Sequence, residues 1–498
     1  MTEEDEMFES AELGHKIDKA TYNKEVPQLR ESLLNAQFDL AEDSTFPVII
    51  LVGGVDGAGK GETVNLLNEW MDPRHIQAHA MGDPTPEEQE RPPMWRFWRA
   101  LPPNGKIGIF FGSWYTAPIV NRVTGRSKKS DLNRSIDEIN RFEKMLTDEG
   151  ALIIKFWFHL SKKAQKKRLK ALEKDPKTRW RVNDTDWTRF KVYNKFRKWS
   201  EHTLENSTDV APWIVVEGVN ARYRSLTVGK ILLEALRKKL DKKERKKAVV
   251  KTALLDPRID KRNVLRSLDM SLAHTKPVYK RELEKLQGRL NLLTRSPKFK
   301  NKLSLIVAYE GADAGGKGGN IRRVTAALDA RYYNIIPVAA PTEEERAQPY
   351  LWRFWRHVPA KGMVTIFDRT WYGRVLVERV EGFCSEADWM RAYSEINDFE
   401  EQLVRNNILV VKFWIAISKE EQLRRFKERE KIGFKRFKIT EEDWRNREKW
   451  DEYEKAVCDL VDRTSTDIAP WTIVEGNNKY YSRIKALKTL CDTIEAAM

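Results

Sequence analysis

The sequence lacks the features of secreted and of membrane-spanning proteins. No stretch approaches the ~18 uncharged apolar residues that a membrane span needs, and the longest apolar runs, 151–160 and 408–417, each contain a lysine. The acidic N-terminus (MTEEDEMFES) has no apolar core of the kind that a secretory signal needs. The three cysteines, Cys384, Cys458 and Cys491, are widely spaced, and the seven histidines form no ligand cluster. We therefore expect a cytoplasmic protein with reduced thiols, without a structural metal site and without a membrane partner.

The chain is too long for a single hydrophobic core and carries an excess of positive charge. Its 498 residues favour two to four domains. Lysine and arginine number 90 against 74 for aspartate and glutamate, a net charge of +16, with dense basic patches at 162–170, 237–247 and 424–438. Such a charge indicates nucleic acid, an acidic membrane or a polyphosphorylated substrate as a partner, and a basic solvated surface is the common alternative.

The two halves of the chain repeat one another. Five motifs of the first half recur in the second: GGVDGAGKGE as EGADAGGKGG, MWRFWR as LWRFWR, SWY as TWY, LIIKFWFHLS as LVVKFWIAIS, and APWIVVEG as APWTIVEG. The spacing is 257 residues between Trp114 and Trp371, and 258 between Pro212 and Pro470. This constancy indicates a tandem duplication. We expect a first domain at 1–240, a helical linker at 241–300 and a second domain at 301–498.

Each copy alternates apolar strands with amphipathic helices. In the second copy, continuous apolar runs predict buried parallel strands at 303–309, 363–367, 409–417 and 471–475. Helices are expected at about 318–328, 388–405 and 419–431. This alternation predicts a three-layer α/β domain with a parallel sheet, present twice. The Trp-Arg-Phe-Trp-Arg stripes are interpreted as core and not as base-stacking platforms.

A glycine-rich turn in each copy has the sequence of a phosphate-binding loop. The pattern G-x-x-x-x-G-K follows an apolar strand and opens a helix at 54–60 and again at 311–317. Glycines let backbone N–H groups surround phosphate oxygens, and the lysine reaches the terminal phosphates. The residue after the lysine is glycine and not the usual Ser or Thr, so Asp313 is the expected magnesium ligand of the loop. The predicted phosphate-binding residues of the loop are Gly311, Ala314, Gly315, Gly316, Gly318 and Gly319.

A second carboxylate follows the strand expected at 363–367. Asp368 stands at the Walker B position, where a carboxylate beside a phosphate-binding loop holds magnesium. Arg369 and Arg374 are then expected to grip phosphate oxygens with their forked donors. We predict that Asp313, Lys317, Asp368 and Arg369 are catalytic, and that Asp313 and Asp368 bind Mg²⁺. A surface ion pair is the alternative for the Asp-Arg dipeptide taken alone.

The first copy lacks these groups. At the positions equivalent to Asp368, Arg369 and Arg374 it has Phe111, Gly112 and Ala117. A magnesium–phosphate complex would there lose a ligand and its neutralising partners. The first copy is therefore expected not to catalyse, although its loop lysine, Lys60, remains available for an anion.

A basic segment between two expected helices predicts a lid. Four of its residues, Arg425, Arg429, Lys435 and Lys438, are the predicted contacts to phosphate. Such a lid would close over the transferred phosphoryl group and exclude water. An exposed basic helix end is the alternative for each residue taken alone.

Together these motifs resemble the polyphosphate kinase type 2 family. The resemblance rests on the glycine loop, the Leu-Trp-Arg-Phe-Trp-Arg stripe, Asp-Arg-Thr-Trp-Tyr, the basic lid, Trp-Asp-Glu-Tyr and Ala-Pro-Trp, and it covers both halves. It implies a fold like that of thymidylate kinase with a helical lid, and Mg²⁺-dependent phosphoryl transfer between inorganic polyphosphate and a nucleotide. Asp313 and Asp368 would position the metal, Lys317 and Arg369 the transferring phosphates, and the lid the polyphosphate chain. The tandem form is similar to the subgroup that phosphorylates nucleoside monophosphates, chiefly AMP to ADP.

Other functions remain open at this point. They are a polyphosphate-dependent nucleoside diphosphate kinase, an ATP-dependent nucleotide kinase of thymidylate kinase type, and a polyanion-binding protein without activity. We expect polyphosphate and AMP or ADP as partners and no nucleic acid. The sequence leaves open the favoured direction, the base preference and whether the chain forms a homo-oligomer.

Overall fold

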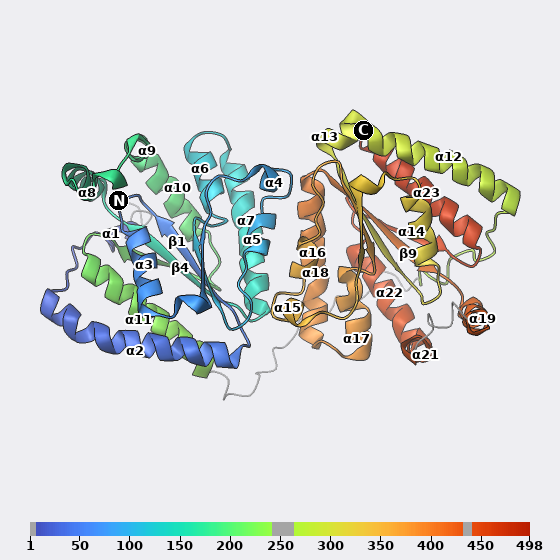
Figure 1. Cartoon of the computed structure of the whole chain (residues 1–498), viewed down its shortest axis with the longest axis horizontal. Coiled ribbons are helices and arrows are strands. Elements are labelled where there is room, and N and C mark those ends of the chain that lie inside the picture. Colours follow the sequence, from blue (N-terminus) through green and yellow to red (C-terminus); the bar gives the residue numbers. More distant parts are fainter. Residues whose placement is uncertain (1–5, 242–262, 432–440) are drawn as a thin grey trace. The chain divides into compact units, whose positions relative to one another are not determined.

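The computed structural model describes residues 6–241, 263–431 and 441–498, which belong to two compact units. The N-terminal unit comprises Met1–Pro84, Arg96–Ala248 and Thr342–Pro349, and the C-terminal unit comprises Thr85–Trp95, Val249–Pro341 and Tyr350–Met498. Each unit thus includes a short segment from the other half of the chain. Each has a central sheet with helices on both of its faces (Figure 1).

The two sheets have the same topology. The N-terminal strands are β1 (Val48–Gly54), β2 (Ile76–Ala80), β3 (Ile107–Phe111), β4 (Leu152–His159) and β5 (Trp213–Glu217). The C-terminal strands are β6 (Ser304–Gly311), β7 (Tyr333–Pro337), β8 (Val364–Asp368), β9 (Ile408–Ala416) and β10 (Trp471–Glu475). All pairs are parallel, in the orders β2-β3-β1-β4-β5 and β10-β9-β6-β8-β7, so the first strand of each copy lies in the middle. The predicted duplicated three-layer fold is confirmed.

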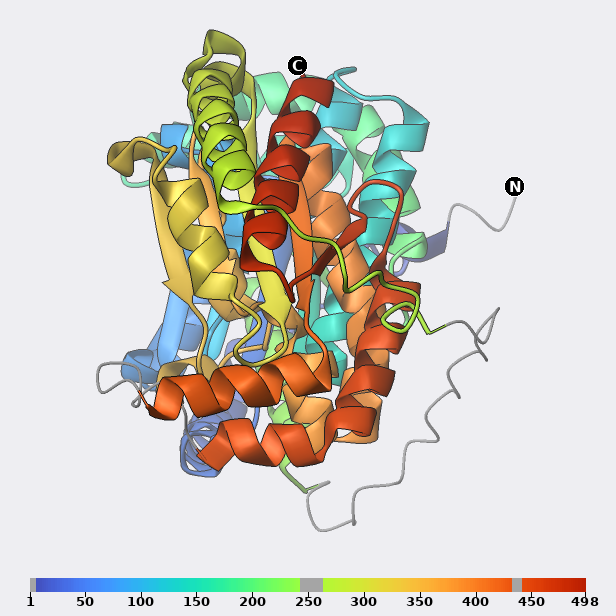
Figure 2. The same ribbon diagram turned by 90° about the vertical axis from the view of Figure 1, so that its right-hand side faces the viewer.

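Apolar helix faces cover the C-terminal sheet. One layer contains α12 (Lys276–Arg295), α14 (Lys317–Thr325) and α23 (Lys479–Ala496), whose Leu290, Val324 and Leu487 pack against strand residues such as Val307 and Ile366. Helices α12 (yellow-green) and α23 (dark red) lie side by side (Figure 2). The other layer contains α16 (Trp352–Trp355), α18 (Glu386–Arg405) and α22 (Trp450–Thr464). The aromatic side chains of α16 are buried, which confirms their interpretation as core.

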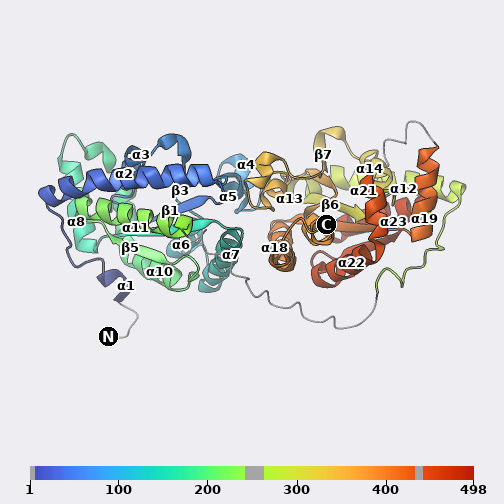
Figure 3. The ribbon, with the colours of Figure 1, turned by 90° about the horizontal axis from the view of Figure 1, so that it is seen from below.

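The N-terminal unit is built in the same way. Helices α2 (Lys19–Asp43), α3 (Lys60–Trp70) and α11 (Ala221–Asp241) share one apolar cluster with β1, β3 and β4. Helices α2 and α11 run side by side (Figure 3). Within the described part of the chain, no helix is long and apolar enough to cross a membrane.

The described part of the segment expected as a linker includes two helices. These are α12 and the short α13 (Pro297–Lys302), and both lie within the span assigned to the C-terminal unit. Tyr279, Leu286 and Leu290 of α12 are buried in the core of that unit. Residues 242–262 of the expected linker lie outside the described residues.

A buried polar network accounts for several repeated motifs. Lys412 of β9 donates from Nζ to a carboxylate oxygen of Glu400 at 2.7 Å and to the hydroxyl oxygen of Tyr372 at 2.9 Å. The tyrosine hydroxyl in turn donates to Glu400 at 2.6 Å. Lys155 and Glu143 form the same buried pair in the N-terminal unit, also at 2.7 Å. The KFW lysine therefore recurs because each copy needs both partners of one buried ion pair, since a single buried charge without its partner is costly. The tryptophan of SWY and TWY recurs because it donates a hydrogen bond to the glutamate of that pair.

Candidate active site of the C-terminal unit

The glycine loop joins β6 to α14 at the carboxyl end of the sheet. Gly311 has a φ of 149°, and a Cβ there would lie 2.5 Å from the carbonyl oxygen of Ile415, so only glycine fits. Lys317, the first residue of α14, folds back and donates from Nζ to the carbonyl oxygen of Gly311 at 2.8 Å. The loop thus holds its lysine beside the N-terminus of a helix, where positive potential favours anions.

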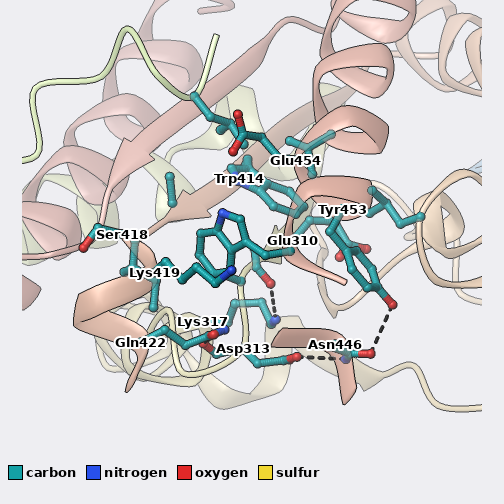
Figure 4. A pocket seen from close by; sticks show the side chains of 18 of the residues that line it. Glu310, Asp313, Lys317, Trp414, Ser418, Lys419, Gln422, Asn446, Tyr453 and Glu454 are labelled. Carbon is teal, nitrogen blue, oxygen red and sulfur yellow. Dashed lines mark hydrogen bonds between the residues drawn. The ribbon is translucent and has the colours of Figure 1, made fainter. Parts of the chain in front are cut away.

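Asp313 is fixed at the tip of this loop by residues distant in sequence. Its carboxylate accepts a hydrogen bond from Nδ2 of Asn446 at 2.9 Å and lies 3.5 Å from Nη2 of Arg369. Asn446 belongs to α21 (Glu441–Glu448) and accepts at its Oδ1 from the hydroxyl of Tyr453 at 3.2 Å (Figure 4). The carboxylate of Asp313 is therefore oriented before any ligand arrives.

Asp368 and Arg369 follow at the end of β8. Asp368 is in register with Tyr309 of β6, which places it beside the start of the loop. Arg369 has a left-handed backbone, with a φ of 65°, and its N–H bonds to the carbonyl oxygen of Tyr309 at 3.0 Å. Gly112, the equivalent residue of the N-terminal unit, has a φ of 82°. A non-glycine residue is strained in this conformation, so the C-terminal unit tolerates a cost of about 1 kcal/mol to keep an arginine here.

Glu310 is a buried carboxylate beside the loop that the sequence motifs do not indicate. It is 6% exposed and accepts a hydrogen bond from the hydroxyl of Thr370 at 2.8 Å. Burial raises its pKa, and the positive charge of Lys317 acts against that rise. The sequence contains one signal for this carboxylate. A glutamate ends an apolar strand at a position where the first copy has Gly53.

A cavity of about 410 Å³ is bordered by residues of the loop and by Glu310 and Arg369. Its polar end is formed by Asp313 and Lys317 of the loop together with Glu310 (Figure 4). Arg369 borders this end as well. The remaining wall is largely apolar: Leu265, Leu268, Met270, Leu376, Val377, Trp414, Ile417, Trp450 and Val457. The site thus combines a charged end with an apolar chamber.

Two of the predicted site residues in the described part of the chain, Asp368 and Arg374, are not part of the wall of this cavity. Arg374 pairs with Glu378 at 2.7 Å, and its guanidinium lies 4.2 Å from the ring centroid of Tyr350. Its contact with phosphate stays a prediction.

The described part of the predicted lid is helix α19 (Lys419–Glu430). Arg425 of this helix is buried, and its guanidinium donates to the carbonyl oxygens of Ala314, Gly315, Gly476 and Asn477 at 2.6–2.9 Å. Arg425 therefore links the glycine loop to the residues that follow β10 through hydrogen bonds to both segments. Arg429 borders a second cavity beside the loop. Lys435 and Lys438 lie outside the described residues.

The N-terminal unit has the loop without the charged partners. Nζ of Lys60 donates to the carbonyl oxygens of Gly54 at 2.6 Å and Val55 at 3.1 Å, so its donors are used within its own loop. Asp56, the equivalent of Asp313, lies 3.5 Å from Arg189, which replaces Asn446. A cavity of about 520 Å³ lies here, but its wall carries Phe111 and Gly112 in place of the carboxylate and the arginine.

The sequence of the whole chain matches one protein family in two places. The profile described as Polyphosphate kinase 2 matches residues 16–246 and again 273–498. The chain belongs to the polyphosphate kinase 2 family. This confirms the resemblance that the motifs gave, and the two matches agree with the duplicated sheets.

Close relatives cover the chain from end to end. A protein of Pseudomonas aeruginosa named polyphosphate:AMP phosphotransferase is 60% identical over 492 residues, 99% of both chains. A protein of the same name from Pseudomonas syringae pv. tomato is 56% identical over 492 residues, again 99% of both. A crystal structure from Pseudomonas aeruginosa PA01 described as a polyphosphate kinase 2 superposes with a TM-score of 0.88, at 57% identity and 99% coverage of both chains.

Proposed function

We propose that this protein transfers the terminal phosphoryl group of inorganic polyphosphate to AMP, which yields ADP. The observation that carries the proposal is the C-terminal cavity, where Asp313, Lys317 and Arg369 meet at one end of an apolar chamber. The name of the two full-length relatives, polyphosphate:AMP phosphotransferase, supports the same reaction. Polyphosphate carries about one negative charge per unit, and the net charge of +16 suits such a donor.

The chain's own residues would act mainly by placing and neutralising phosphate. Phosphoryl transfer requires little covalent chemistry from a protein, so positioning and charge stabilisation supply most of the catalysis. The loop N–H groups and Lys317 would hold the transferring phosphoryl group. Arg369, kept near the loop by its strained backbone, would stabilise the charge that spreads over the phosphoryl oxygens.

Asp313 and Asp368 are the residues that would hold Mg²⁺. No group of three or more His, Cys, Asp or Glu side chains forms a metal site among the described residues. Two carboxylates fit magnesium nonetheless, because this ion keeps several waters and binds proteins through one or two carboxylates together with substrate phosphates. The orientation of the Asp313 carboxylate by Asn446 also suits a ligand role. When bound, the ion would neutralise phosphate charge.

The apolar chamber would receive the nucleoside of the acceptor. Leu265 and Leu268 come from a segment that is anchored by Asn263, whose Oδ1 accepts from the N–H groups of Leu265 and Arg266 at 3.0 and 3.1 Å. Arg266 in turn pairs with Glu454 of α22 at 2.6 Å. Apolar and aromatic walls of this kind suit a nucleobase.

In the first copy an aromatic side chain covers one face of the equivalent tryptophan. Phe8, which stands 257 residues before Leu265, is fully buried and stacks on Trp157, with ring centroids 6.0 Å apart. Trp157 is the equivalent of Trp414, which lines the C-terminal cavity. This contrast supports catalysis by the C-terminal unit alone.

Product analysis tests the proposal. The full-length protein would be incubated with Mg²⁺, AMP and polyphosphate, and the nucleotides separated by chromatography. ADP should accumulate with polyphosphate and not when ATP replaces it as the donor. Formation of ATP from ADP with AMP inert would overturn the choice of acceptor, and activity with ATP alone would overturn the donor.

We also propose the cytoplasm as the compartment of the reaction. Cys384, Cys458 and Cys491 are all free thiols, which supports the cytoplasm as the compartment. We propose polyphosphate and adenine nucleotides as the ligands there.

A further inference from the structure

A cavity larger than that of the active site lies beside the glycine loop of the N-terminal unit. Its volume is about 520 Å³, against about 410 Å³ in the C-terminal unit. Gly112 replaces Arg369 in its wall, and the cavity also reaches residues 80–82, at the end of β2. Their counterparts among the described residues, 337–339, do not border the active-site cavity. This copy has therefore lost catalytic side chains and kept, beside its loop, a space that the proposed reaction does not use.

The loop at this cavity keeps the backbone of a phosphate-binding loop. Gly54 and Gly59 have φ values of 123° and 89°, and a Cβ on Gly54 would lie 2.1 Å from the carbonyl oxygen of Phe158. Lys60 opens the 11-residue helix α3 and folds back onto the carbonyl oxygen of Gly54, as Lys317 folds back in the other loop. The charge of the lysine and the positive end of the helix thus stay beside the cavity, where they favour an anion.

The charge beside this loop is positive, whereas the active site is rich in acids. Four carboxylates lie around the loop of the C-terminal unit: Glu310, Asp313, Asp368 and Glu442. The N-terminal unit keeps one of them as Asp56 and has Gly53, Phe111 and Thr185 in place of the others. The Asp56 carboxylate lies between two cations, 3.4 Å from Nζ of Lys60 and 3.5 Å from Nη1 of Arg189. Two cations against one carboxylate attract an anion without the help of a metal ion.

Aromatic rings make up much of the remaining wall of the cavity. They belong to Phe111, Tyr115, Trp157, Tyr193, Phe196 and Trp213. Phe111 and Val120, which both border the cavity, are 37% and 40% exposed. A flat apolar ring bound there would remove this surface from water, which favours binding. Aromatic walls with few polar groups therefore suit a nucleobase.

Two buried polar groups of the wall lack a partner. Nε1 of Trp157 and Oε1 of Gln165 have no hydrogen-bond partner among the described residues, although both residues are only 3% exposed. In the C-terminal unit, Gln422 accepts at Oε1 from Arg447 at 3.2 Å, but the counterpart of Arg447 is Phe190. Nε2 of Gln165 donates to a loop carbonyl oxygen at 3.0 Å, which places this amide at the loop. Because buried polar groups are normally paired, one donor and one acceptor remain for a ligand.

We infer that the N-terminal cavity is a second, non-catalytic site that binds a nucleoside monophosphate without a metal ion. The loop and Lys60 hold the phosphate, the aromatic wall holds the base, and a hydroxyl or amino group of the ligand donates to Gln165. No phosphoryl transfer follows, because Phe111 and Gly112 stand where the active site has a carboxylate and an arginine. The inference concerns binding alone, so it does not depend on the reaction proposed above.

Titration calorimetry of the full-length protein with AMP, in EDTA and without polyphosphate, tests the inference. The first variant is Gly82→Trp. Gly82 borders the cavity and a Cβ there meets no atom within 4 Å, so an indole can fill the space, and the variant should bind one AMP fewer per chain than the wild type. The second variant, Lys60→Met, replaces the ammonium group by an uncharged chain. It should weaken the same binding event by about tenfold or more, as expected for the loss of a charge-assisted hydrogen bond.

Each variant has a matched control. Gly82→Ala adds only a Cβ and leaves the cavity open, so it should bind AMP as the wild type does. Lys163→Ala removes one positive charge from α8 (Lys162–Lys174), where this exposed side chain is not among the described residues that border the cavity, so AMP binding should stay unchanged. Adenosine reports the contribution of the phosphate, and it should bind this site roughly tenfold more weakly than AMP or worse.

Three results would overturn the inference. They are an equal number of bound AMP molecules in the wild type and Gly82→Trp, equal effects of Lys60→Met and Lys163→Ala, and a difference between the wild type and Gly82→Trp that appears only after Mg²⁺ is added. Circular dichroism reports whether the variants fold, and Lys60→Met carries the test if the tryptophan variant does not. ADP formation is not measured, so failure of the proposed reaction would leave this test unaffected.

Discussion

Replacing Arg369 by glycine should separate the stability of the C-terminal unit from its activity. Arg369 has a φ of 65°, and its counterpart Gly112 has a φ of 82°. Because a Cβ is strained in the left-handed region, Arg369→Gly should remove about 1 kcal/mol of strain. The arginine also lies 3.5 Å from Asp313 and 3.9 Å from Glu442, but it is 45% exposed, so losing both pairs should cost only about 0.2–1 kcal/mol.

Arg369→Ala provides the comparison. The alanine variant loses the same ion pairs but keeps the strained Cβ, so the glycine variant should be the more stable of the two by about 1 kcal/mol. For a unit of this size that corresponds to a difference in Tm of about 2–4 °C, measurable by calorimetry. Both variants should lose about 10²–10³ in kcat, because both remove a donor aimed at the transferring phosphoryl group.

Gly112→Ala is the reciprocal change in the other copy. A Cβ at this residue would lie 2.7 Å from the carbonyl oxygen of Met81 and would take on a positive φ, so Tm should fall while kcat stays unchanged. An alanine variant at Arg369 that is as stable as the glycine variant would refute the strain argument. A glycine variant with full activity would refute the role of the guanidinium.

Three further predictions concern the division of labour between the copies, the acceptor and the metal. Lys317→Ala should lower ADP formation by orders of magnitude and Lys60→Ala far less, because the first copy has Phe111 and Gly112 in place of Asp368 and Arg369; equal losses in the rate assay would contradict this. Leu265→Phe, which copies Phe8 of the first unit, should raise KM for AMP with little effect on KM for polyphosphate, whereas Phe8→Leu should change neither, and steady-state kinetics of both variants would decide. Chelation by EDTA should abolish turnover and added Mg²⁺ should restore it; activity that survives chelation would exclude the ion from the proposed site.

Much of the fold could be predicted because buried parallel strands are continuous apolar runs. The strand expected at 471–475 is β10 (Trp471–Glu475), and the helix expected at 388–405 is α18 (Glu386–Arg405), whose start is set by a capping box at Ser385. Strand β7 (Tyr333–Pro337) was missed. It is an edge strand with three of its five residues exposed, and it lacks the long apolar run on which the other predictions depended.

The site could be predicted only where its residues are neighbours in sequence. Lys317 and Asp313 belong to one loop motif, but Asn446 reaches the loop from a helix more than 130 residues away. Nothing in its local sequence indicates that contact. For Arg425 the local sequence is informative about charge but not about the partner. Its charge predicts a contact with phosphate, whereas in the folded chain its guanidinium donates to four backbone carbonyl oxygens.

The two copies together show which residues serve the fold and which serve the reaction. Both keep the buried lysine–glutamate pair, since losing one partner would leave a charge without compensation in the core. Only the C-terminal copy keeps an arginine with a strained backbone at this position. Because the strain costs stability and gives no gain in packing, a functional role of the side chain explains why it is kept. The N-terminal copy has an unstrained glycine at that position, Phe8 in the place of Leu265, and Arg224 bonded to the loop carbonyl oxygen of Ala58. It keeps a cavity but lacks the carboxylate and the arginine that would act on phosphate, and this is why we assign the chemistry to the C-terminal unit.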